Sequence, residues 1–226
     1  MSELTLHAVG ISTCTKRVGI ILHEKQIPFK LAPIDFMAGK HKSPEHLEKH
    51  PFGQVPVLED DDFFLFESRA ISKYLATKYA AQGTPNLVPD FSDLKATAKF
   101  EQASSVESFD FEAVVYPIIM DGFFAKFGDP AHVPNQALLA KHAEILEGKL
   151  DGYERILSKQ KYLAGDNITV VDLFHLPHGT ILPVVLGKDP LDNEKRPHLA
   201  RWWKDLQARP SWAAVKDGVE EKERYD

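Results

Sequence analysis

The spacing of apolar positions divides the chain into an alternating first part and a helical second part. Before residue 80, short apolar runs at 4–9, 29–31, 56–59 and 63–66 predict strands. Residues 16–24 and 67–79 predict helices, because their apolar residues recur every three or four positions. The first two strands flank a helix and are expected to be parallel, and the next two form a hairpin across Asp60, Asp61 and Asp62.

From Leu94 onward, the helical period dominates and no strand is predicted. The apolar stripe of the first long helix is predicted at Phe100, Ala103, Val106, Phe109, Ala113, Tyr116, Ile119 and Phe123. That of the second is predicted at Leu138, His142, Ile145, Lys149, Tyr153 and Leu157. Pro117 should kink or interrupt the first of these helices, because proline has no N–H to donate.

These elements predict two domains of different class. The order β-α-β, β-β-α over residues 1–81 is typical of an α/β thioredoxin-like domain, and residues 92–226 are expected to form an all-α helical bundle. A polar stretch with Gly83, Pro85 and Pro89 predicts a linker at 82–91. Thr169 and Asp172 predict a capping box, flanked by Ile168 and Leu173, to which we assign a folding role.

Composition restricts the class of partner and the compartment. The formal net charge is −6, which disfavours binding to nucleic acid or to an acidic membrane. No apolar run approaches the roughly 20 residues of a membrane span, and the first residues lack a secretory signal pattern. A single cysteine, Cys14, excludes an intramolecular disulfide and fits a reducing compartment, so we expect a cytoplasmic protein.

Two predicted helix starts in the first domain are candidate anion sites. Ser12 precedes the first helix, where free amides and the helix dipole favour an anion, although the residue is also a normal N-cap. Glu67 and Ser68 open a later helix, where they suit a carboxylate and a neighbouring ammonium group, or serve as a capping pair. A carboxylate and an ammonium group on one carbon form an amino-acid terminus, so Glu67 and Ser68 fit the amino-acid end of a peptide ligand.

Two further features fit the rest of such a ligand. The cluster Lys40, His41 and Lys42 follows the second strand and is either a solvated loop or a site for a second carboxylate. Val55 precedes Pro56, and a proline at this place in thioredoxin-like folds is cis. The backbone of Val55 would then pair with the ligand's peptide group.

The motifs around these positions resemble those of phi-class glutathione transferases. The motifs are HKSPE at 41–45, PFGQVPVLED at 51–60 and FESRAI at 66–71, followed by SFD at 108–110, the helix start at 165–172 and PHLARWW at 197–203. The resemblance covers nearly the whole chain. It implies an enzyme that adds the thiolate of glutathione to small hydrophobic electrophiles, with glutathione as co-substrate and without a metal or other cofactor.

The resemblance also implies a role for each matching residue. Ser12 corresponds to the catalytic serine, and Phe52 to an aromatic residue of a homodimer interface. The implied glutathione ligands are His41, Lys42, Gln54, Val55, Pro56, Glu67 and Ser68. We expect the electrophile between the domains, near Ile11, Phe36, Phe109, Ala113, Tyr116 and Met120. The chain departs from the family at Thr13 and Cys14, where a proline usually follows the serine.

Several alternatives remain open from sequence. The chain could add glutathione peroxidase activity, or be a non-catalytic carrier of apolar ligands. Cys14 could support thiol–disulfide exchange, although it lies two residues past the position of the redox cysteine in thioredoxin-like folds. His175 and His178 have a two-histidine spacing, but Pro177 lies between them and no third metal ligand is evident.

Overall fold

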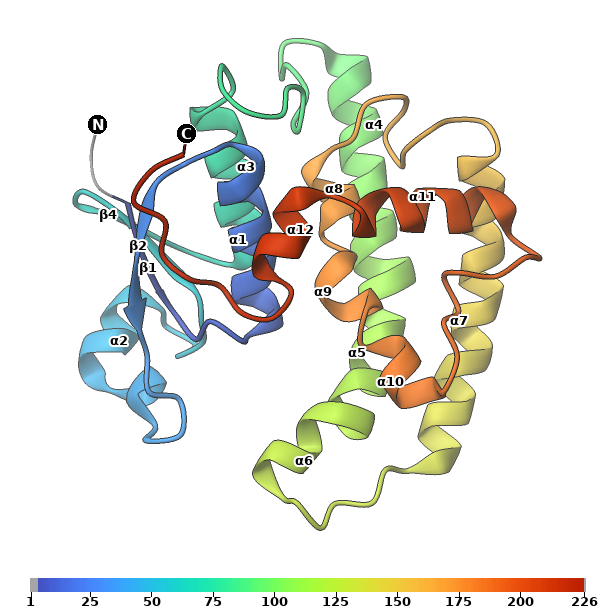
Figure 1. Cartoon of the computed structure of the whole chain (residues 1–226), viewed down its shortest axis with the longest axis horizontal. Helices are drawn as coiled ribbons and strands as arrows, with labels where there is room; N and C mark the ends of the chain where they lie inside the picture. The colour runs from blue at the N-terminus through green and yellow to red at the C-terminus, as the bar shows by residue number, and fades with distance from the viewer. Residues whose placement is uncertain (1–3, 226) are drawn as a thin grey trace. The chain divides into compact units, whose positions relative to one another are not determined.

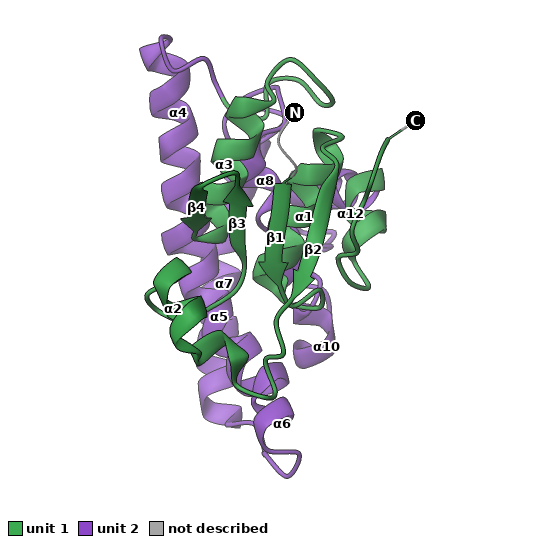
Figure 2. Ribbon diagram, turned by 90° about the vertical axis from the view of Figure 1, so that its left-hand side faces the viewer, with its two compact units in different colours: residues 1–88, 209–226 green, residues 89–208 purple. Residues whose placement is uncertain are grey.

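A computed structural model describes residues 4–225, which form two compact units. The first unit comprises residues up to 88 together with those from Arg209 onward, and the second comprises Pro89–Ala208 (Figures 1 and 2). The sequence predicted that 92–226 would form one domain, whereas the last part of the chain belongs to the first unit. Within residues 4–225, no helix is both long and apolar enough to cross a membrane.

The first unit contains the predicted four-stranded sheet. Its strands are β1 (Leu4–Ala8), β2 (Phe29–Pro33), β3 (Val57–Asp60) and β4 (Phe63–Phe66), in the order β2-β1-β3-β4. β1 pairs with β2 in parallel and with β3 antiparallel, and β3 and β4 form the expected hairpin. The peptide bond Val55–Pro56 is cis, as predicted. The thioredoxin-like order of elements is therefore confirmed.

Helices α1 (Thr13–Glu24) and α3 (Ser68–Lys78) pack against each other on one side of this sheet, which Figure 2 shows from its strand side. The predicted inner face of α1 is confirmed, because Val18, Ile21 and Leu22 are fully buried. On α3 the predicted face was partly wrong. Ala70 is exposed and Tyr74 half-buried, and the core face consists of Ile71, Ser72, Leu75 and Ala76. The helix α2 (Pro44–Lys49) and a 3₁₀ turn (Lys40–Lys42) lie in the β2–β3 connection.

The end of the chain returns to the first unit and packs against α1. Helix α12 (Pro210–Val215) contacts α1, and Lys222 exchanges backbone hydrogen bonds with Phe29 of β2. Glu24, the last residue of α1, accepts hydrogen bonds from Arg209 Nε and Ser211 Oγ, both at 2.5 Å. Burial alone would raise the pKa of Glu24, but these hydrogen bonds and the Arg209 charge lower it below its ordinary value.

The predicted linker is attached to the same end of α1. No helix or strand lies between Lys78 and Leu94 in the described chain, as the polar composition predicted. The buried ammonium of Lys25 donates to the carbonyl of Thr84 at 2.7 Å and to that of Gln82 at 3.2 Å. These bonds hold residues up to 88 in the first unit.

The second unit is helical, and its first helices follow one another without a break from Leu94 to Gly128. The elements are α4 (Leu94–Ser105), a π segment (Val106–Glu112), α5 (Ala113–Ile119), a second π segment (Met120–Phe124), α6 (Ala125–Gly128), α7 (Gln136–Leu157), α8 (Val170–Leu173), α9 (Leu176–Gly179), α10 (Leu182–Leu186) and α11 (Pro197–Gln207). The helical run continues through Pro117, which lies inside α5, and the departures from α-helical bonding lie on either side of α5.

The π segments explain why the predicted stripe of the first long helix was wrong at three positions after Ala103, although Ile119 is buried as predicted. A π turn closes on the fifth residue rather than the fourth, so it inserts about one residue into the helical register. The buried positions change accordingly to Phe111, Val114, Val115, Ile118 and Ile119. Phe109, Ala113 and Tyr116 are instead exposed.

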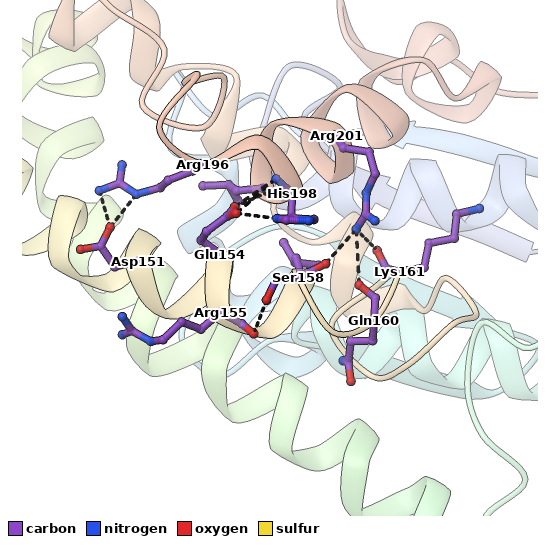
Figure 3. Close-up of polar contacts among 11 residues, drawn as sticks. Asp151, Glu154, Arg155, Ser158, Gln160, Lys161, Arg196, His198 and Arg201 are labelled. Atoms are coloured by element: carbon purple, nitrogen blue, oxygen red, sulfur yellow. Dashed lines mark hydrogen bonds and ion pairs between the residues drawn. The ribbon is translucent and has the colours of Figure 1, made fainter.

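The predicted stripe of α7 was displaced by one position in its first half, where the buried residues are Leu139, Leu146 and Leu150. From Tyr153 on, the prediction was correct. Figure 3 shows how the polar side of α7 holds the start of α11. The Glu154 carboxylate accepts hydrogen bonds from the backbone amides of His198 and Leu199, and Arg196 donates to Asp151. The N-terminus of α11 is thus capped by a side chain from another helix.

The predicted capping box at the start of α8 is confirmed. The Asp172 carboxylate accepts from the Thr169 backbone amide at 2.9 Å and from the Thr169 hydroxyl at 3.0 Å. It also accepts from the Leu163 amide and the Trp202 indole, both at 2.9 Å. Asp172 is completely buried, and Ile168 and Leu173 are buried beside it. This carboxylate therefore connects three segments of the second unit.

Candidate functional site

Ser12 occupies the N-cap of α1, as predicted, but its side chain makes no capping hydrogen bond. The backbone holds the residue instead, because its amide donates to Val9 O and its carbonyl accepts from the Lys16 amide, each at 2.9 Å. The side chain is half-buried at the end of the helix where backbone amides are unpaired. Ser12 therefore offers a hydroxyl that the helix itself does not use.

The returning end of the chain holds the turn that carries Ser12. The Val219 amide donates to Gly10 O at 3.0 Å, and Lys16 Nζ donates to Lys216 O at 2.8 Å. A Cβ atom at Gly10 would come within 2.8 Å of Val219 O, so glycine is required for this close approach. No local pattern in the sequence indicates these contacts, since they join residues about 200 positions apart.

The start of α3 combines an exposed carboxylate with a buried hydroxyl. Glu67 is exposed and has a φ of 70°, a conformation that is costly outside glycine and recurs at functional sites. Neither its side chain nor any other forms a cap at this helix start. Ser68 is buried, and its Oγ accepts a hydrogen bond of 2.9 Å from Arg17 Nη1. The pair therefore presents a negative group beside a hydroxyl of fixed orientation.

Arg17 is a residue at this site that sequence reasoning missed as a functional candidate. It projects from the buried face of α1, is 1% exposed, and joins α1 to the start of α3 through Ser68. Cys14 is half-buried, with its sulfur 3.6 Å from Arg17 Nη1. The available signal was the placement of an arginine four residues before Ile21, on the helix face that should be apolar.

The basic cluster forms the 3₁₀ turn Lys40–Lys42 and contacts two aromatic residues of the first unit. The His41 ring stacks on Phe36 with centroids 3.8 Å apart, and Lys42 Nζ donates to Phe52 O at 2.8 Å. Desolvation, followed by the charges of Lys42 and His46, lowers the pKa of His41, so this imidazole is neutral near pH 7. Lys42 therefore supplies the positive charge of this pair.

A second residue missed by sequence reasoning, His46, holds the loop before Pro56. Its Nε2 donates to Gln54 O at 2.7 Å, and its amide donates to Ser43 Oγ at the start of α2. His50 lies one turn further along and stacks on Phe66, with ring centroids 4.8 Å apart. The spacing of these two histidines on a short helix was the available signal.

The predicted electrophile-binding residues are exposed on their respective units. In the first unit, Ile11 and Phe36 are 63% and 48% exposed. In the second unit, the exposed residues are Phe109, Ala113, Tyr116 and Met120, at intervals of four, three and four. That spacing places them on one face of α5 and its flanking turns. Each unit therefore has exposed apolar side chains that its own core does not cover.

Two cavities occur elsewhere, beside α7 in the second unit. They have volumes of about 200 Å³ and 310 Å³. Both are lined by Val106, Gly152, Arg155 and Ile156. None of the predicted site residues in the described chain lines either cavity, so the chemistry proposed from sequence does not depend on them.

The two histidines considered as metal ligands have separate internal partners. His175 Nδ1 donates to Val171 O at 3.0 Å, while the Tyr153 hydroxyl lies 2.9 Å from its Nε2. His178 Nδ1 donates to Glu112 Oε2 at 2.9 Å. Residues 4–225 contain no group of three histidine, cysteine or acidic side chains placed to hold a metal ion. These histidines belong to the core of the second unit.

Comparison with known proteins agrees with this fold. The family model for the glutathione S-transferase N-terminal domain matches residues 2–77, and that for the C-terminal domain matches residues 115–210. Glutathione S-transferase PM239X14 of Arabidopsis thaliana is 44% identical over 205 residues, covering 90% of this chain and 91% of that protein.

Solved structures give the same result. Glutathione transferase F7 of Populus trichocarpa superposes with a TM-score of 0.87 at 39% identity, covering 96% of this chain and 99% of that one. Glutathione S-transferase I from maize, described in complex with an atrazine glutathione conjugate, has a TM-score of 0.81 at 33% identity, covering 95% and 96%.

A thioredoxin-like unit followed by an all-helical unit defines the class of fold to which these structures belong. The chain itself belongs to the glutathione S-transferase family, and its resemblance to the phi class is confirmed.

Proposed function

We propose that this protein binds glutathione on its first unit, ionises the thiol beside Ser12 and conjugates it to small hydrophobic electrophiles. The single observation that carries the assignment is the Ser12 hydroxyl, which stands at the N-terminus of α1 and makes no capping hydrogen bond. The names of the relatives support the same reaction class, since this chain matches glutathione S-transferases over most of their length.

The Ser12 hydroxyl and the dipole of α1 together can stabilise the glutathione thiolate by the required amount. A free cysteine thiol has a pKa of about 8.5, so about 3% is thiolate at pH 7. Lowering that pKa by about two units requires about 2.7 kcal/mol of preference for the anion. A hydrogen bond from Ser12 to the charged sulfur supplies about 1.5–3 kcal/mol, and the dipole of α1 up to about 1 kcal/mol.

The reaction then needs no further base at the sulfur. The thiol proton leaves to solvent when glutathione binds, and the sulfur lone pair forms a carbon–sulfur bond with the electrophile. Any leaving group departs with the electron pair of the bond that breaks. Ser12 acts only as a hydrogen-bond donor to the sulfur and is itself unchanged.

The rest of the glutathione molecule is assigned to the other elements of the first unit. Ser68 and the amides at the start of α3 bind the α-carboxylate of the γ-glutamyl group, and Glu67 accepts from its ammonium group. Lys42 and His41 bind the glycyl carboxylate. The backbone of Val55, before Pro56, pairs with the cysteinyl amide, and Gln54 completes the loop.

We propose that the electrophile is bound by a set of mostly apolar residues, namely Ile11, Phe36, Phe109, Ala113, Tyr116 and Met120. Their exposure in the absence of a ligand supports this role, since an exposed apolar patch marks a binding surface. The maize relative described with an atrazine glutathione conjugate is consistent with a flat, weakly polar second substrate.

We further propose a cytoplasmic homodimer. Phe52 is 66% exposed, and such a large apolar side chain fits burial against a second copy. Sedimentation at micromolar concentration should give a dimer that Phe52→Ser converts to monomer. A monomeric wild-type protein would refute the dimer without affecting the chemistry.

The decisive test of the proposed function is the ionisation of bound glutathione. Difference absorbance of the thiolate, titrated in wild type and in Ser12→Ala, should place the thiol pKa of the wild-type complex about one to two units lower than that of the variant, which keeps the α1 dipole. Conjugation of an aromatic electrophile and reduction of a hydroperoxide are measured in parallel, with Cys14→Ser as the matched control. Activity that is retained by Ser12→Ala but lost in Cys14→Ser would support the thiol–disulfide alternative instead.

A further inference from the structure

Arg17 is an unusual group to find inside α1. It is 1% exposed among the apolar side chains that join α1 to α3, and burying a guanidinium costs free energy unless hydrogen bonds and charges offset it. Its Nη1 donates to Ser68 Oγ at 2.9 Å, at the first residue of α3. A buried cation is thus directed at one of the proposed glutathione ligands.

The direction of this hydrogen bond fixes the role of Ser68. A guanidinium has donors only, so the serine oxygen must be the acceptor. The hydroxyl has one proton of its own, which is therefore directed away from Arg17. A hydroxyl that accepts from a cation is also a stronger donor, because hydrogen bonds in a chain polarise one another.

We propose that Arg17 is a positioning residue of the glutathione site, which holds the Ser68 hydroxyl as a donor to the α-carboxylate of the γ-glutamyl group. The inference rests on the proposed function and adds to it a residue that does not itself contact the ligand. Arg17 belongs to α1, whose N-cap is Ser12. The same side chain therefore also connects α1, assigned to the sulfur of glutathione, with the start of α3, assigned to its carboxylate.

This role predicts a specific pattern of binding. Arg17→Met keeps a long apolar side chain but removes the donors, so Ser68 can turn its proton elsewhere. We expect the affinity for S-methylglutathione, which cannot react, to fall about tenfold, the effect of one hydrogen bond to a charged group. The KM for glutathione should rise by a similar factor, while kcat at saturating glutathione stays within about twofold.

The experiment is a double-mutant cycle measured by titration calorimetry with S-methylglutathione. Wild type, Arg17→Met, Ser68→Ala and the double variant are compared. If Arg17 acts through Ser68, the double variant binds no more weakly than Ser68→Ala alone. Unchanged binding in Arg17→Met, or losses that multiply in the double variant, would overturn the assignment.

Two controls separate positioning from a general loss of structure. An analogue of S-methylglutathione without the γ-glutamyl α-carboxylate should bind wild type and Arg17→Met equally. Lys25→Met removes another buried cation of the same unit, which donates to Gln82 and Thr84 carbonyls, and should leave S-methylglutathione binding unchanged. If Arg17→Met does not fold, the shorter Arg17→Leu, which also lacks donors, takes its place in the cycle, with the same results required.

The outcomes also separate this inference from the proposed function. Wild-type protein that fails to bind S-methylglutathione refutes the glutathione site as a whole. Wild-type binding with independent effects of Arg17 and Ser68 refutes only the positioning role.

Discussion

Both α1 and α8 follow a hydroxyl residue at the N-cap, but the hydrogen bonding of the two helix starts differs. At α8, the Thr169 amide and hydroxyl both donate to Asp172, and the whole group is buried. At α1, Ser12 stands in the same position but its side chain makes no capping bond and is half-buried. A helix start whose side chains satisfy one another contributes to folding, whereas one with an unused hydroxyl is available to a ligand.

The largest effect is expected at Asp172. Its carboxylate accepts four hydrogen bonds in a fully buried position, so Asp172→Ala leaves several donors unsatisfied. We expect the free energy of unfolding to fall by about 4 kcal/mol, as measured by urea denaturation. Asp192→Ala, which removes an exposed partner of Lys204, is the control and should cost less than about 1 kcal/mol. Equal losses in the two variants would contradict the assignment.

At Ser12 the effect should appear in turnover instead. Ser12→Ala should lower kcat at pH 7 about 4- to 40-fold, because losing about 1.5–3 kcal/mol raises the thiol pKa from about 6.5 by about one to two units and lowers the thiolate fraction. Its free energy of unfolding should stay within about 0.5 kcal/mol of wild type, because no capping bond is lost. Ser105→Ala, which removes a hydroxyl bonded within α4, is the control for turnover. A stability loss without a turnover loss would make Ser12 an ordinary cap.

The same chemical change at α8 should give the opposite result. Thr169→Ala removes the hydroxyl that donates to Asp172 and should lower the free energy of unfolding by about 1–2 kcal/mol. Turnover measured below the unfolding temperature should match wild type. Reduced turnover in a fully folded Thr169→Ala protein would mean that the two helix starts are not separate in function.

The smallest effect concerns pH. Burial lowers the pKa of His175 below its ordinary value of 6.5, so this ring is neutral when folded. The associated stability is complete above pH 6.5 and is lost as pH falls below it, because only the unfolded chain then takes up the proton. The slope for one proton is at most about 1.4 kcal/mol per pH unit. Unfolding at several pH values should show a smaller slope in His175→Gln than in wild type.

Most of the first unit was predictable because its strands, helices and turns are each marked by residues close together in the sequence. The sheet, the parallel and antiparallel pairings, and the position of Ser12 at a helix start all follow from patterns within a few residues. The Thr169–Asp172 pair was predictable for the same reason. Spacings of three or four residues reflect the hydrogen bonds within a helix and at its start, so they can be read from the sequence alone.

The predictions that failed concern features that depend on contacts between residues far apart in the sequence or on irregular helical turns. The predicted stripe was wrong at Phe109, Ala113 and Tyr116, because the Val106–Glu112 segment closes π turns that no residue type marks. Arg17 was missed because its partner, Ser68, lies 51 positions away. A periodic pattern identifies which face is apolar, but it does not reveal which polar group a buried cation meets.

The bond between the Val219 amide and Gly10 has a consequence for how this protein is made. On a ribosome, the turn that carries Ser12 emerges about 200 residues before the residues that hold it in place. The surface of α1 that Val215 and Val219 cover stays open while the residues between α1 and Val215 are made. The thioredoxin-like unit is therefore completed only after the helical unit has emerged, and a fragment cut at residue 88 would be an unfinished domain.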